Sequence, residues 1–218
     1  MKKKTILHWL GLTGLVAFLS YALAVFLSPL AYPGYNWMAQ AVSDLSAETA
    51  PSKQLWSQLS AFYDVLSPVC SICVVIFVAS RKTSTKLFRI GIYLFAAMNF
   101  ISAIGYKMFP LVEAGKDIHS FQEVMHIVVT ALVVLLSISS LVLLIIAGCR
   151  DKRMRAIAIF AIVALLMMMV GSAGTGLVPK EYFGIAERFS VFAAVGFTAV
   201  LGVCQFVGLF DPRPTERN

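Results

Sequence analysis

Charged residues are scarce in this sequence. Asp, Glu, Lys and Arg make up 13% of the 218 residues, whereas the hydrophobic fraction is 59% and the mean hydropathy is +0.84. Soluble domains contain about 25% charged residues, so most of this chain needs lipid as its solvent. No segment is left to form a soluble nucleic-acid-binding domain, despite a formal net charge of +7.

The sequence also lacks one signature of serine hydrolases and one signature of transporters. The sequence has no Gly-x-Ser-x-Gly elbow, the motif that exposes the nucleophile of many serine hydrolases. It shows no internal repeat, which counts against the repeat-built transporter folds. The pair Cys70-x-x-Cys73 lies in an apolar stretch without polar neighbours, so we interpret these cysteines as packing residues and not as a redox or metal site.

Six apolar stretches dominate what is present. Each is about 20 residues long, which is the length of a helix that crosses a hydrocarbon core of about 30 Å. The expected spans are residues 8–28, 56–79, 88–108, 123–148, 156–177 and 188–209. The sequence therefore predicts an all-α, polytopic membrane protein, a bundle of six transmembrane helices that forms a single domain over residues 1–218.

The basic residues gather in alternate connections. Thirteen of the 18 Lys and Arg lie in residues 2–4, 81–89, 150–155 and 213–217, whereas the other connections hold five basic and eight acidic residues. The positive-inside rule places the Lys- and Arg-rich side in the cytoplasm. We therefore expect a bacterial cytoplasmic membrane protein with both termini inside. Lys2 to Lys4 and Ala22-Leu23-Ala24 resemble a signal peptide, but the apolar run continues to Leu30, so we expect a retained helix.

Polar residues inside the spans concentrate near the outward ends. They include Asp64, Glu123, His126, Thr130, Glu187 and Arg188. Ionisable groups in a membrane span are costly and face the bundle interior or water, so we hypothesise a polar cavity open to the outside. In the first outward loop, Pro33-Gly34 forms a turn, and the spacing from Trp37 to Leu45 predicts a short amphipathic helix. That helix would hold Ser43 and Asp44 close to the outward site, although both could equally be capping residues.

These residues allow several chemistries. Glu123 and His126 form a Glu-x-x-His pair, which with Asp64 and Glu187 makes a weak candidate for a metal site. Ser43, Asp44, His119 and His126 are the candidate catalytic residues of a serine-type site. The histidines would instead serve a proton-responsive site, or would simply be solvated or bonded to neighbouring helices. Asp64, Glu187 and Arg188 are the candidate ligand-binding residues. No cofactor is predicted.

Several motifs resemble those of a bacterial and archaeal membrane family, domain of unknown function 998. They are Tyr32-Pro33-Gly34-Tyr35, Ser43-Asp44-Leu45-Ser46, Ala50-Pro51, Phe109-Pro110, His119, His126 and Gly184-Ile185-Ala186-Glu187-Arg188. The resemblance spans most of the chain and implies the same six-helix plan, but no activity. The Ser-Asp pair followed by proline is also similar, more distantly, to a eukaryotic membrane group of autophagy modulators and glycolipid-anchor remodelling factors. That similarity implies a tie to outer-leaflet or lumenal lipids.

The sequence thus favours a protein that binds a lipid headgroup or a small envelope ligand at an outward-facing polar site. An outer-leaflet lipid hydrolase or acyltransferase, dependent on Ser43 or on a metal, is the alternative, and a solute or proton-coupled transporter is the third possibility. The expected partners are membrane lipids and either a second copy or another membrane protein, without nucleic acid.

Overall fold

Helices make up almost all of the regular structure. The structure is a computed structural model and describes residues 4–80, 85–113 and 120–211. Its α-helices are α1 (Ile6–Leu10), α2 (Thr13–Leu27), α3 (Lys53–Ala79), α4 (Lys86–Met108), α5 (Phe121–Arg150), α6 (Arg155–Leu177) and α7 (Phe183–Phe206). Short 3-10 helices occupy Ser28–Ala31, Ser43–Ser46, Lys152–Met154 and Lys180–Tyr182. The described residues contain no strand, so the expected all-α class is confirmed.

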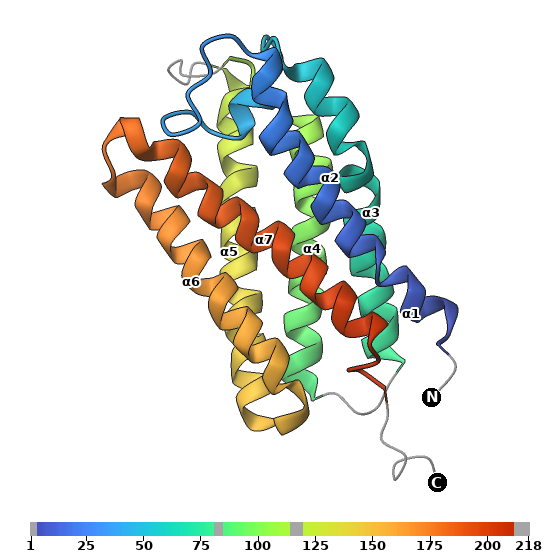
Figure 1. Cartoon of the computed structure of the whole chain (residues 1–218). Coiled ribbons are helices and arrows are strands. Elements are labelled where there is room, and N and C mark those ends of the chain that lie inside the picture. The colour runs from blue at the N-terminus through green and yellow to red at the C-terminus, as the bar shows by residue number, and fades with distance from the viewer. Residues whose placement is uncertain (1–3, 81–84, 114–119, 212–218) are drawn as a thin grey trace, which may run out of the picture.

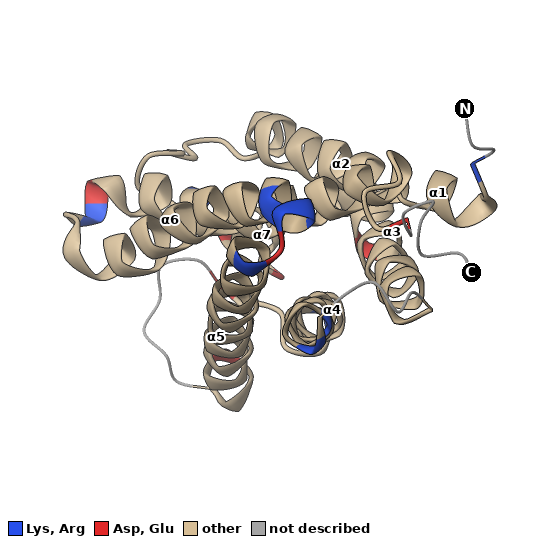
Figure 2. Cartoon of the chain, turned by 90° about the horizontal axis from the view of Figure 1, so that it is seen from below, with Lys and Arg blue, Asp and Glu red and all other residues tan. Residues whose placement is uncertain are grey.

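Six helical segments are long and apolar enough to cross a membrane. They are the joined α1 and α2, then α3, α4, α5, the segment that contains α6, and the segment that contains α7. Successive segments are antiparallel, and both termini lie at the same end of the bundle (Figure 1). Seen from that end, Lys and Arg lie at the ends of helices, including α4 and the start of the chain (Figure 2). The chain is therefore a multi-pass membrane protein, and we call the end opposite the termini the distal end.

Glycines bring the junction of α1 and α2 into direct backbone contact with α7 near the termini. A Cβ on Gly11 would collide with the carbonyl oxygen of Gly202, and a Cβ on Gly202 would collide with that of Gly11. Farther along, Phe18 and Tyr21 of α2 contact Phe192 of α7 through their rings, at centroid distances of 6.3 and 6.4 Å. The two helices are thus joined through backbone at one end and through aromatic side chains toward the distal end.

A buried amide links three helices in the middle of the bundle. The Oδ1 atom of Asn99 accepts hydrogen bonds from Ser67 Oγ at 2.7 Å and Thr198 Oγ1 at 3.3 Å, and its Nδ2 donates to Phe95 O at 3.1 Å. A polar side chain in hydrocarbon needs such partners, so Asn99 fixes the register of α3, α4 and α7.

Candidate functional site

The first long loop, residues 32–52, folds back onto the start of α7 at the distal end. The guanidinium of Arg188 makes most of this contact. Its Nη1 donates to the carbonyl oxygens of Trp37 at 2.7 Å, Gln40 at 3.0 Å and Gly184 at 2.7 Å. Its Nη2 donates to the Tyr35 hydroxyl at 2.7 Å, which in turn donates to Ala41 O at 2.8 Å. The planar guanidinium therefore fixes the path of the loop over α7.

Glu187 binds the next residues of the same loop. Its Oε2 accepts the backbone N–H of Val42 at 2.8 Å, and the Ser43 N–H also bonds to this carboxylate. Asp44 turns back on the loop, because its Oδ2 accepts the Ala41 N–H at 3.1 Å. The structure therefore brings together Ser43, Asp44, Glu187 and Arg188, four of the residues singled out from the sequence. We call this group, with Tyr35, the distal corner.

Gly184 allows the loop to approach α7 closely. A Cβ at this position would collide with the backbone oxygens of Gln40 and Trp37. At the next residue, the Ile185 N–H donates to Met38 O at 3.2 Å, which satisfies a backbone donor of the first helical turn. The motif Gly184-Ile185-Ala186-Glu187-Arg188 thus acts as a docking surface for the loop.

Burial changes the acid–base behaviour of the distal corner. Burial raises the pKa of Asp44 above its ordinary value, although the Ala41 N–H and the Arg188 charge oppose this change. Burial likewise raises the pKa of Tyr35 to about 12, against the opposing effect of Arg188. Tyr35 is therefore a neutral phenol at physiological pH and serves as both donor and acceptor.

Tyrosines from three other helices lie in the distal half of the bundle. Tyr21 of α2 contacts Phe192 of α7 through its ring, and Tyr106 of α4 donates to Thr130 Oγ1 of α5 at 3.1 Å. Tyr63 of α3 packs against Tyr21 at a centroid distance of 4.6 Å and bonds to Ser102. These partly buried tyrosines therefore join neighbouring helices to one another.

Asp64 has a different partner from the other acidic candidates. Its Oδ2 lies 3.1 Å from Nζ of Lys107, and the two side chains are 28% and 60% exposed. This pair joins α3 to the distal end of α4 at the bundle surface. The Asp64 carboxylate is thus paired with Lys107 and not with a group of the distal corner.

Glu123 and His126 begin α5 but bind different groups. The Glu123 Oε2 accepts from Ser120 N and Oγ at 2.9 and 2.8 Å, so it completes a capping box. His126 Nδ1 donates to the Phe109 carbonyl at 2.9 Å, which leaves Nε2 as the basic nitrogen of the neutral ring. The ring also packs on Tyr106 at 5.1 Å.

In the part of the chain that the structure describes, the side chains form neither the metal site nor a pair of Ser43 with His126. Among the described residues, no group of three or more His, Cys, Asp and Glu side chains could hold a metal ion. No hydrogen bond of these residues joins Ser43 Oγ to His126. His119, the other candidate base, lies outside the described residues.

The predicted amphipathic helix between Trp37 and Leu45 is wrong. The loop contains only the short 3-10 helix Ser43–Ser46. Asn36 and Gln40 side chains bind backbone N–H groups at residues 38 and 36, which competes with helical hydrogen bonding. Val42 and Leu45 are buried in the protein and do not lie on a membrane surface.

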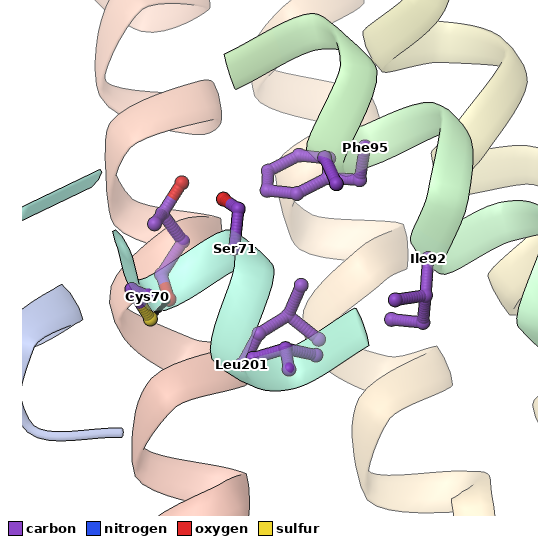
Figure 3. Close-up of a pocket in the computed structure, with 8 residues that line it drawn as sticks. Cys70, Ser71, Ile92, Phe95 and Leu201 are labelled. Carbon is purple, nitrogen blue, oxygen red and sulfur yellow. Dashed lines mark hydrogen bonds between the residues drawn. The ribbon is translucent and has the colours of Figure 1, made fainter. Parts of the chain in front are cut away.

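The two best-defined cavities do not lie at the distal corner, where the sequence suggested a polar cavity. The smaller, of about 10 Å³, lies between α3, α4 and α7 beside Cys70, Ser71, Ile92, Phe95 and Leu201 (Figure 3). Its hydroxyl groups are already bonded, since Ser71 donates to Ser67 O and Thr198 donates to Ala194 O. The space has the size of a single water and offers no free polar group to a ligand.

The match to a family model covers the helices and loop that build this site. The chain belongs to the DUF998 family. The model of this family, described as a protein of unknown function, matches residues 15–204, which include α3 to α6, most of α2 and α7, and the whole distal corner. No curated protein is significantly similar to the chain. No solved structure is significantly similar to it either.

Sequence reasoning missed part of this DUF998 site. The role of Tyr35 in binding Arg188 was not foreseen, although Tyr35 belongs to the motif Tyr32-Pro33-Gly34-Tyr35, because the spacing of a loop does not show which side chains it meets. The sequence analysis also did not consider His8, whose Nε2 lies 3.3 Å from Asp211 and thus joins the first helix to the end of the described chain.

Proposed function

We propose that this DUF998 protein binds a lipid headgroup or a small envelope ligand at its distal end, with Glu187 as the group that receives it. The observation that carries this proposal is the carboxyl group of Glu187 on a membrane-spanning helix, which accepts loop N–H groups of Val42 and Ser43 and interacts with Arg188 and Asp44. Ionisable side chains at such positions are costly to keep and are typical of functional sites.

The charges near Glu187 favour a ligand with amine or hydroxyl groups. Asp44 and Glu187 carry two carboxyl groups, and the cation Arg188 interacts with both. The Nη atoms of that cation already bind the loop carbonyls of Trp37 and Gln40. A donor group on the ligand would therefore complete the hydrogen bonds of the carboxylate and offset its charge.

Arg188 has a positioning role in this proposal. It holds the loop whose Val42 N–H fixes the Glu187 carboxylate. The ligand donors then meet a carboxylate held in one orientation, which lowers the entropic cost of binding.

Mass spectrometry of small molecules and lipids extracted from purified protein tests the proposal. We expect a stoichiometric, chemically uniform ligand in wild type and at least a tenfold lower content in Glu187→Gln. The matched control is Glu181→Gln, which makes the same change on an exposed residue at the same end. Equal ligand content in the two variants, or a wild-type protein that carries no ligand, would contradict the proposal.

A further inference from the structure

A groove of about 260 Å³ lies along α7 in the half of the bundle nearer the termini. Figure 1 shows α7 between α2 and α6, and these two helices supply the walls. The groove is lined by Leu15 and Phe18 of α2, Phe160 of α6, and Gly196, Ala199, Val200, Val203 and Cys204 of α7. Its floor is at the depth of the Asn99 network, because Ala199 follows Thr198 directly.

The lining of this groove excludes a polar ligand. All its side chains are apolar apart from the thiol of Cys204, and all belong to membrane-spanning segments. A ligand with hydroxyl, amide or charged groups would lose its hydrogen bonds to water without gaining others. Leu15, Phe160 and Val203 are exposed, so the groove opens toward the surrounding hydrocarbon.

The surroundings of the groove favour a hydrocarbon chain as its occupant. Its lining residues lie on membrane-spanning segments, which are surrounded by lipid tails. The groove has a volume of about 260 Å³ and is open on its lipid-facing side. A single hydrocarbon chain is narrow enough to enter, and apolar burial stabilises it there through close contacts.

Gly196 gives the groove its depth. A Cβ at this position would meet only Phe18 Cε2, at 3.8 Å, so no neighbour of this chain fills the space. We propose that this groove holds one acyl chain of a membrane phospholipid. The proposal does not rest on the function proposed for Glu187, since none of the lining residues belongs to the distal corner.

Native mass spectrometry of the protein released from phospholipid nanodiscs tests this site. We expect wild type to keep one phospholipid per chain at collision energies that remove the other lipids. Gly196→Leu and Val203→Phe place a side chain in the groove, and we expect each to lower that occupancy at least fivefold. The matched controls are Gly176→Leu, at a glycine with no atom within 4 Å of its Cβ, and Val170→Phe, at an exposed valine of α6.

Each other outcome overturns the proposal. Equal lipid retention in groove and control variants would place the lipid elsewhere. A wild-type chain that retains no lipid would show that the groove binds no more tightly than the bilayer. A dimer that Gly196→Leu disrupts would assign the groove to a second copy of the chain. Glu187→Gln separates the two proposals, because it should leave the groove lipid in place.

Discussion

Arg188 and Glu187 are neighbours in sequence but bind the loop through opposite chemistry. The guanidinium has several N–H donors in one plane and contacts carbonyl oxygens of Trp37 and Gln40. The carboxylate accepts the N–H of Val42 one step farther along the loop. Arg188 thus binds the loop through its carbonyl oxygens, and Glu187 binds the same loop through its N–H groups.

Arg188→Lys tests whether this loop depends on the guanidinium. A lysine keeps the charge but lacks the planar fork, so it cannot bind Trp37, Gln40 and Tyr35 together. We expect a loss of about 2–3 kcal/mol in local stability, the cost of hydrogen bonds to a charged group. Hydrogen exchange of the Ala41 and Val42 amides measures it. Arg155→Lys, at an exposed site, is the control, and unchanged exchange in Arg188→Lys would refute the assignment.

Asp44→Asn should reveal the burial of the Asp44 carboxyl as a pH dependence. Because burial raises the pKa of Asp44, the folded chain holds this proton more tightly than the unfolded chain. Wild-type stability therefore falls as pH rises from about 4 through the raised value. We expect the variant, which keeps an acceptor for Ala41, to match wild type below pH 4 and to unfold at a higher temperature at pH 7. Thermal unfolding measures this. If the difference in unfolding temperature between the variant and wild type is the same at both pH values, the Asp44 carboxyl does not cause the pH dependence.

At the scale of elements, the close contact between the loop and α7 depends on a missing side chain. Gly184→Ala would drive a Cβ into the oxygens of Gln40 and Trp37. We expect a cost of about 1–3 kcal/mol, as for other overpacked sites. Gly176→Ala meets no atom within 4 Å, so only helix propensity remains, which favours Ala by up to about 1 kcal/mol. The unfolding temperature should therefore fall in Gly184→Ala and rise in Gly176→Ala. A shift of both variants in the same direction would argue against the close contact.

The helices were predictable because a lipid solvent requires long apolar runs. The predicted spans agree with the helices to within a few residues, with the largest difference at the last one, expected from residue 188 but beginning at Phe183. The conformation of the first long loop could not be predicted from the spacing of its apolar residues. Its conformation depends on Gly34 at a φ of 79°, on side-chain caps and on distant contacts with α7.

Part of the candidate site was also predictable, because ionisable residues are conspicuous in apolar membrane spans. Ionisable residues in apolar surroundings identified Glu187 and Arg188, and the structure places them against Ser43 and Asp44. The pairing of Asp64 with Lys107 was not foreseen, since contacts between helices depend on their rotation. Glu123 was given a metal role, although its position three residues after Ser120 already matched a capping box.

At the scale of the whole molecule, both termini lie at the end opposite the distal corner (Figure 1). The distribution of Lys and Arg predicts that this end faces the cytoplasm. Cys149 lies there and is the exposed cysteine of the described residues, whereas Cys70, Cys73 and Cys204 are buried. We expect an impermeant maleimide to label wild type only after the cells are permeabilised. Glu48→Cys, in the exposed loop, should label in intact cells, and labelling of Cys149 there would reverse the orientation.

The central claim is that a ligand is bound beside Glu187 at the distal end. Photocrosslinking tests it most directly, with azidophenylalanine in place of Tyr106, which lies near the distal end of α4 and whose hydroxyl donates to Thr130. The account predicts one adduct of defined mass after irradiation in membranes, and its loss when Glu187→Gln is combined with the probe. An adduct that persists in the Glu187→Gln chain, or irradiation that yields none, would contradict the account.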